Sequence, residues 1–216
     1  MPQSYRIAHL AGLLYVAIIA LGLTAEFAIR APLIGPDAEA TASALAANST
    51  VFRLSILADV VMVAADLALA LALYLFFRGA APLLVLFATA FRMMQAAVLA
   101  AALILPLAAI SLVDYAETAH VLVSLHAEAY DLGLIFFGVN TVLLALVMAR
   151  ATFVPNWLSA LMGAAGVVYL IGSTLRILRP DLIGAFEPAY AIALVAELSF
   201  TIWLLTRNRG MTTLAV

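Results

Sequence analysis

The sequence predicts an all-α integral membrane protein, a bundle of six transmembrane helices. Of its 216 residues, 67% are hydrophobic and only 10% are charged, whereas a soluble domain is about half apolar and about a quarter charged. A chain of this length cannot bury so many apolar side chains in a core of its own, so we expect lipid around them. The apolar residues also run in stretches of about twenty or more, the length that a helix needs to cross a bilayer.

The stretches follow one another along the chain. The first, 7–29, is longer than the apolar core of a signal peptide and no clear cleavage site follows it, so we expect it to span the membrane. Residues 35–49 are too short and too polar to cross, and we expect a surface helix that starts at Asp37. The remaining spans are predicted at residues 52–77, 82–110, 118–149, 155–176 and 187–206.

Prolines mark the beginnings of three of these spans. In the first turn of a helix the missing N–H removes no helical hydrogen bond, and this is where Pro82, Pro155 and Pro188 lie. The fourth span, 118–149, is longer than a bilayer is thick, so we expect it to be tilted or to begin with an interfacial turn. The sequence shows no fixed-period repeat and no change of composition that would mark a second domain. We therefore expect one domain over residues 1–216.

Arginine distribution predicts the orientation. One set of helix ends carries Arg6, Arg78, Arg150, Arg207 and Arg209. The opposite ends carry acids and fewer arginines, namely Asp37, Glu39, Asp114, Glu117, Asp181, Glu187, Arg30, Arg53, Arg176 and Arg179. By the positive-inside rule, both termini should be cytoplasmic, in a multi-pass protein of the plasma (inner) membrane.

Two residue types are missing, and their absence excludes several kinds of chemistry. Without cysteine there are no disulfides, thiolate nucleophiles or cysteine metal ligands. All ten basic residues are arginines, and without lysine no Schiff-base mechanism can operate. The net charge of -2 is too small to favour nucleic acid as a partner.

Helical spacing gathers the polar residues of the spans into stripes. Each of three sets should share one helix face: Ser55, Asp59 and Asp66; Thr89, Arg92 and Gln95; Tyr190, Glu197 and Thr201. In the fourth span, His126, Tyr130, Gly133 and Asn140 should line one face, and Ser124, Glu128 and Asp131 nearly the opposite one. We expect neither stripe to face lipid, and therefore expect this helix in the middle of the bundle.

The cost of burial indicates that these acids need partners or a function. One acid in mid-membrane costs ~3 kcal/mol, so six of them would cost ~18 kcal/mol, more than the net stability of a domain. The six are Glu26, Asp59, Asp66, Glu128, Asp131 and Glu197, and the only arginine placed near mid-depth is Arg92. We expect the acids to be paired, protonated or hydrated, and to share one pocket in the outer half of the bundle.

Candidate roles follow from the residue types. Asp59, Asp66 and Glu197 are the candidate acids, and Asp131 or His126 would take the final proton. The candidate substrate-binding residues are Arg92, Gln95, Glu128, Tyr130, Phe137 and Trp203, and an aromatic lining would also include Phe136, Tyr169 and Phe200. Ion pairs that only hold helices together are the alternative.

The spacing of the polar residues does not favour a metal site or a Ser-His-Asp catalytic triad. His126 faces away from Glu128 and Asp131, so three ligands do not converge, and we expect neither a metal nor a cofactor. There is no Asp-Asp-x-x-Asp run to hold magnesium and a diphosphate. A triad of Ser124, His126 and Asp59 lacks a nucleophile elbow.

Four segments resemble a family of small bacterial membrane proteins catalogued as domain of unknown function 4386. They are "RIAHLAGLLYVAIIALGLTAEFAIRAPLI", "FRLSILADVVMVAADLALALALYLFFR", "FRMMQAAVL" and "LHAEAYDLGLIFFGVN", and the likeness continues through "YLIGS" and "AELSFTIWLL". The resemblance implies six helices and no particular activity. It implies one shared site made of Arg53, Asp59, Asp66, Arg92, Gln95, His126 and Glu197.

A second resemblance is one of kind only. Small integral-membrane terpene cyclases are bundles of similar size with acids buried among aromatic residues, but no motif aligns and no residue is carried over. From the surplus of buried acids beside aromatic residues, we expect an enzyme that protonates an alkene or epoxide and starts the cyclisation of an isoprenoid. Expected partners are the lipid bilayer and a lipophilic small molecule, with no nucleic acid, and the protein should be a monomer or homodimer.

Two other functions remain open. A proton-coupled small-molecule transporter would also use intramembrane acids. Against it, the sequence shows no inverted repeat and no proline in a span except Pro106, near an outer end. The other is a structural or regulatory membrane protein in which the polar residues only lock the helices together.

Overall fold

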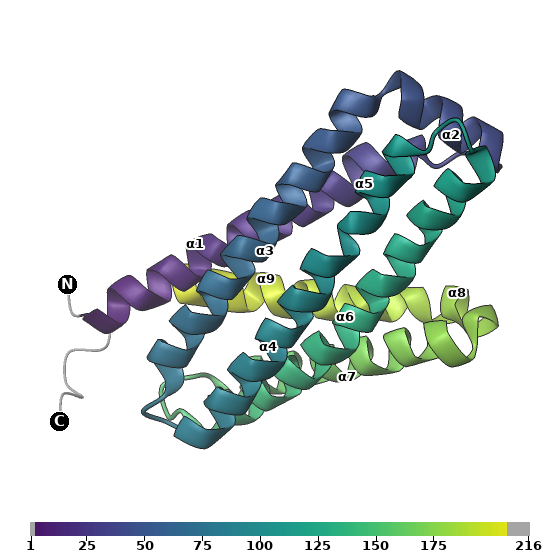
Figure 1. Cartoon of the computed structure of the whole chain (residues 1–216). Coiled ribbons are helices and arrows are strands. Elements are labelled where there is room, and N and C mark those ends of the chain that lie inside the picture. The colour runs from purple at the N-terminus through teal and green to yellow at the C-terminus, as the bar shows by residue number, and fades with distance from the viewer. Residues whose placement is uncertain (1–2, 207–216) are drawn as a thin grey trace.

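The computed structural model describes residues 3–206, which are helical almost throughout and contain no strand (Figure 1). Six helical segments in this range are long and apolar enough to cross a membrane: Tyr5–Leu33, Ser49–Phe77, Pro82–Ser111, Ala116–Arg150, Asn156–Leu178 and Pro180–Thr206. The predicted six-helix membrane bundle is thereby confirmed. The orientation remains a prediction, and two of its arginines, Arg207 and Arg209, lie outside the described residues.

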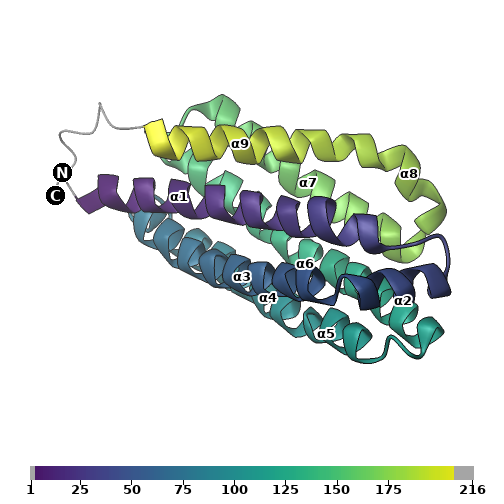
Figure 2. The same ribbon diagram turned by 90° about the horizontal axis from the view of Figure 1, so that it is seen from above.

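The spanning helices form a closed ring. Its members are α1 (Gln3–Leu23), α3 (Ser49–Phe77), α4 (Pro82–Ala102), α6 (Ala116–Arg150), α7 (Asn156–Leu178) and α9 (Tyr190–Thr206). Each packs against the next in this order, and α9 packs against α1 to close the ring (Figures 1 and 2). The first and last described residues lie at the same end of the bundle, which we call the inner end according to the predicted orientation.

The placement of α6 differs from the prediction. It is a member of the ring with partners on two sides, α4 and α7, and not a central helix. The stripe with His126 is buried, but Ser124 and Glu128 of the other stripe are exposed on the outside of the ring. Because Asp131 comes almost one turn after Glu128, it turns toward α7 and is the buried member of that stripe.

A helical cap covers the outer end. The predicted surface helix is α2 (Ala38–Ala47), and the Asp37 side chain accepts a hydrogen bond from the backbone N–H of Ala40 at 2.7 Å, which satisfies a donor at the helix start. Beneath α2, Thr41 is fully buried and its hydroxyl lies 3.2 Å from His120 Nδ1 on α6. The cap packs on an apolar cluster centred on Leu45 and Phe52, so the outer end is covered by structure.

Two spans that the sequence predicts as continuous helices are interrupted on their outer side. After α1, residues Thr24–Arg30 form a π-helical segment, η1, and Ala31–Leu33 form a 3₁₀ turn, η2. Helix α4 ends at Ala102, and α5 (Ile104–Ser111) continues it after Leu103. Pro106 explains the second interruption, because it has no N–H to donate to the carbonyl four residues earlier.

The inner half is held by apolar packing and close helix contact. A large buried cluster includes Phe77, Met148 and Phe200. Helices α6 and α7 cross closely at Gly138 and Gly166, where a Cβ on Gly166 would lie 3.0 Å from the Gly138 carbonyl oxygen. The absence of side chains at these two glycines lets the helices approach this closely.

The long helix of the last span begins later than predicted. Residues 187–206 were expected to be one helix, but Glu187–Ala189 form a 3₁₀ turn and α9 begins at Tyr190. The turn follows two other short elements, Pro180–Leu182 and α8 (Ile183–Phe186), which connect α7 to α9 at the outer end. Pro188 therefore lies in a connection and not in the first turn of the long helix.

Candidate functional site

All six helices of the ring contribute to one cavity of about 100 Å³. Its lining comes from α1 (Tyr15, Ile18), α3 (Met62, Val63, Asp66), α4 (Arg92, Gln95, Leu99), α6 (Tyr130, Leu134, Phe137), α7 (Tyr169) and α9 (Glu197). Arg92 and Glu197 lie near the middle of their helices, so the cavity is about half-way through the bundle. Six candidate site residues meet there: Asp66, Arg92, Gln95, Tyr130, Phe137 and Glu197.

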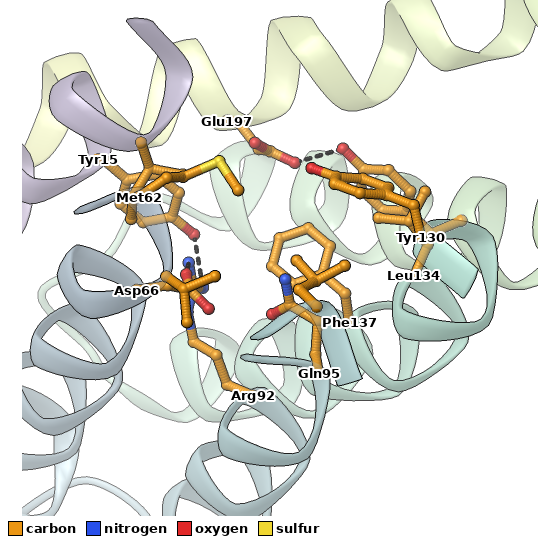
Figure 3. A pocket seen from close by; sticks show the side chains of 13 residues that line it. Tyr15, Met62, Asp66, Arg92, Gln95, Tyr130, Leu134, Phe137 and Glu197 are labelled. Carbon is orange, nitrogen blue, oxygen red and sulfur yellow. Dashed lines mark hydrogen bonds and ion pairs between the residues drawn. The ribbon is translucent and has the colours of Figure 1, made fainter. Parts of the chain in front are cut away.

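An ion pair forms one wall of the cavity (Figure 3). Arg92 donates from Nε and Nη2 to Asp66 Oδ1 at 2.9 and 2.5 Å, and from Nη1 to the Tyr15 hydroxyl at 3.2 Å. The guanidinium also lies 5.1 Å from the ring centroids of both Tyr15 and Phe137. The charge of Arg92 is thus balanced by Asp66, and two aromatic rings are already in contact with a cation.

Glu197 lies on another side of the cavity and has a different partner. The Tyr169 hydroxyl donates to its Oε1 at 2.5 Å, and the ion pairs among the described residues do not include it. Its side chain is partly accessible and lines the cavity. Tyr130 also points toward this side (Figure 3). A carboxyl group here has tyrosines around it and no arginine bonded to it.

Two polar atoms of the cavity wall have no hydrogen-bond partner in the described structure. They are Asp66 Oδ2 and Gln95 Oε1, both in side chains that are buried. Buried polar atoms are nearly always satisfied by protein, water or ligand. The volume of about 100 Å³ is enough for several water molecules or a small polar group beside them.

Asp59 and His126 lie nearer the outer end, close enough to interact electrostatically, and form a second polar cluster with Arg30 and Glu26 instead of sharing the cavity as expected. Arg30 makes an ion pair with Asp59 and a second, at 2.8 Å, with the half-exposed Glu26. The π-helical segment ends at Arg30 and turns this arginine into the bundle, where its side chain is 3% exposed. Sequence spacing predicts a loop arginine there, because it assumes a regular helix that ends earlier.

The surplus of acids over arginines is smaller than expected. Asp131 lies 2.6 Å from Arg176 on α7, away from the cavity. Arginines 30, 92 and 176 therefore balance Asp59, Asp66 and Asp131 separately. Besides Asp131, three candidate residues fall outside both clusters: Glu128 and Arg53 are exposed, and Trp203 packs on Phe200 and Phe76 in the inner apolar cluster.

Sequence reasoning missed Tyr15, which supports the buried arginine. One signal for it exists, since Tyr15 comes three helical turns before Glu26 and so lies on the same face of a regular helix. Tyr169 was expected only as part of an aromatic lining, and its hydrogen bond to Glu197 gives it a polar role. Among residues 3–206, no three His, Asp or Glu side chains are grouped so that they could hold a metal ion.

The fold and this cavity define a multi-pass membrane protein with a polar centre. The chain belongs to the family described as domain of unknown function DUF4386, whose profile matches residues 10–207. It is similar to an uncharacterized protein of Archaeoglobus fulgidus, with 26% identity over 162 residues that cover 73% of this chain and 85% of that protein. No solved structure matches the chain at a significant level.

Proposed function

We propose that this protein is an integral membrane enzyme that transfers protons to and from one end of a lipophilic molecule, with Glu197 as the general acid. The observation that carries the proposal is that Glu197 and Asp66 line one cavity while only Asp66 has an arginine partner. Arg92 stabilises the carboxylate form of Asp66, whereas a buried carboxyl group without a cation is less costly in its neutral form. A neutral and an ionised carboxyl group facing one cavity provide a general acid and a general base.

The cavity limits what the substrate can be. Pockets that enclose a whole drug-sized ligand have volumes of about 300–1,000 Å³, and this one has about 100 Å³. Only the reactive end of a lipophilic molecule fits, such as a terminal alkene or epoxide, while its chain stays among the helices or in the bilayer.

Cyclisation of an isoprenoid, the narrower hypothesis, has less support than protonation at one end. A folded polyprenyl chain needs more volume than this cavity provides. The rings of Tyr15 and Phe137, which would stabilise a carbocation, are already in contact with Arg92. We therefore propose isoprenoid-like chains as substrates for proton transfer, such as isomerisation, with cyclisation as a variant that the same assay detects.

Uptake of solvent deuterium tests this proposal without knowledge of the product. Purified protein in lipid nanodiscs is incubated in D₂O with polyprenyl alcohols, polyprenyl epoxides and total membrane lipid, and the extracts are analysed by mass spectrometry. We expect deuterium in at least one lipid class, and loss of this label in Glu197→Gln. The matched control is Asp131→Asn, which also neutralises an intramembrane acid but outside the cavity, and should keep the label. If wild type and Glu197→Gln give the same labelling, the proposal fails.

A proton-coupled carrier is the second candidate, favoured by one observation. Both helix interruptions, η1 (Thr24–Arg30) and the break at Leu103, lie on the outer side of the cavity. Interrupted helices next to a central polar site are a feature of many transporters. Proteoliposomes with an imposed pH gradient discriminate between the two functions: a flux of a small solute that follows the gradient and disappears in Glu197→Gln favours the carrier over the enzyme.

A further inference from the structure

The outer polar cluster contains two buried acceptor atoms that nothing satisfies. Asp59 Oδ1 and His126 Nε2 have no hydrogen-bond partner among the described residues, although their side chains are only 2% and 6% exposed. Buried polar atoms are nearly always satisfied by protein, water or ligand. Two of them in one cluster indicate that a proton or a water molecule belongs there.

The hydrogen bonds around the two groups fix which atoms can accept a proton. His126 Nδ1 lies 3.2 Å from the carbonyl oxygen of Ala102, so Nδ1 carries the hydrogen and Nε2 keeps a lone pair. Arg30 occupies Asp59 Oδ2, which leaves Oδ1 free. Glu26 is the remaining ionisable group in contact with Arg30, and the four residues of the cluster come from η1, α3 and α6.

The cluster reaches the surface of the bundle on its outer side. The Glu26 side chain is 46% exposed and shares Arg30 with Asp59, so a chain of hydrogen-bonding groups leads from the surface to the buried carboxylate. The π-helical segment makes this connection, because it turns Arg30 inward at the end of the span. A proton route to Asp59 would therefore begin at Glu26.

On its inner side the cluster connects to the cavity. Tyr130 follows His126 by one helical turn, the two ring centroids are 6.4 Å apart, and Tyr130 lines the cavity together with Glu197. Figure 3 shows the tyrosine directed toward the Glu197 side of the cavity. Below the cavity the described packing is mostly apolar, with Phe77, Met148 and Phe200 buried. From Tyr130 the polar groups lead outward, to His126 and Asp59.

We propose that Asp59 and His126 form a proton-transfer site that connects the outer face of the bundle with Glu197. This rests on the proposed function in one respect, that Glu197 exchanges a proton. A proton from outer water adds to Asp59 Oδ1 and moves through a bridging water to His126 Nε2, which gives an imidazolium with Nδ1–H still bonded to Ala102. The proton leaves from the same nitrogen to the Tyr130 hydroxyl, which releases its own hydrogen to cavity water and so to Glu197. Only O–H and N–H bonds form and break, and one proton is passed on.

Infrared hydrogen–deuterium exchange measures this route directly. The carbonyl stretch of a protonated carboxyl group is recorded for the full-length protein in nanodiscs and assigned to Glu197 by its loss in Glu197→Gln. The sample is then transferred to D₂O and the rate of the band shift is followed. Loss of one positioned acid–base group slows proton transfer about a hundredfold or more, and we expect this in Asp59→Asn and in His126→Gln. Glutamine can still donate to the Ala102 carbonyl, so the second variant keeps the structural contact.

Asp131→Asn is the matched control. Both Asp131→Asn and Asp59→Asn remove an ion pair with an arginine near the outer end of the bundle. Asp131, however, lies outside the proposed proton route. The proposal is overturned if exchange in Asp59→Asn and His126→Gln is as fast as in wild type, or if Asp131→Asn slows it equally. If no infrared band is lost in Glu197→Gln, the proposed function fails together with the route. If the band exists but its exchange rate is unchanged by Asp59→Asn and His126→Gln, only the route fails.

Discussion

His126 Nδ1 lies 3.2 Å from the carbonyl oxygen of Ala102, the acceptor that Pro106 leaves without a helical donor. In a regular α-helix this carbonyl would accept from the N–H of residue 106, which proline does not have. His126 of α6 thus supplies the hydrogen bond that Pro106 cannot donate. The break between α4 and α5 is stabilised by this side chain. This contact gives His126 a structural role independent of any proton transfer.

A double-mutant cycle tests the compensation. His126→Leu leaves the Ala102 carbonyl without a donor, and we expect a loss of about 1–3 kcal/mol in the free energy of unfolding. In a Pro106→Ala background the backbone N–H can return, so the same substitution should cost clearly less. Unfolding of each variant in detergent, followed by circular dichroism, gives the four values. Equal losses in both backgrounds would show that the carbonyl is satisfied in another way.

The Asp66–Arg92 pair should behave as a buried pair. Removal of one partner leaves an uncompensated charge, and we expect Asp66→Leu or Arg92→Met to cost about 3–5 kcal/mol. The double variant Asp66→Leu with Arg92→Met has no buried charge and should be more stable than either single variant. The exposed pair Arg179–Asp181 offers the contrast, because Arg179→Gln should leave the melting temperature unchanged. Additive losses in the double variant would contradict this interpretation.

Close contact between α6 and α7 predicts different outcomes for two neighbouring glycines. A Cβ on Gly166 would lie 2.8 Å from the Val142 backbone nitrogen and 3.0 Å from the Gly138 carbonyl oxygen, so the helices must separate. On Gly163 the nearest atom would be Ala145 Cβ at 3.6 Å, an ordinary contact. We expect Gly166→Ala to cost about 1–3 kcal/mol and Gly163→Ala to be tolerated. Similar melting temperatures for the two variants would mean that the crossing is looser than described.

Periodicity was sufficient to predict the spans and half of the cavity. Asp66, Arg92 and Glu197 were placed on inward faces because they sit within regular helical stretches, where a 3.6-residue period fixes direction. The same period gave the wrong direction for the Arg30 side chain. A π-helical segment has more residues per turn than an α-helix, so the side chains after it point in different directions. The period also failed for Glu128, since exposure depends on which neighbours a helix has. Pairing of Asp131 with Arg176 depends on the crossing of α6 and α7, which one sequence does not specify.

The absence of cysteine makes the predicted orientation straightforward to measure. Single cysteines at Glu39, in the outer cap, and at Thr152, between α6 and α7, are exposed at opposite ends of the bundle. With cytoplasmic termini, a membrane-impermeant maleimide should label Glu39→Cys in intact cells and Thr152→Cys only after lysis. The reverse pattern would place the acids of the cap inside, against the positive-inside rule. It would also mean that the connection from Glu26 to the cavity opens to the cytoplasm, so that protons for Glu197 would come from the other side of the membrane.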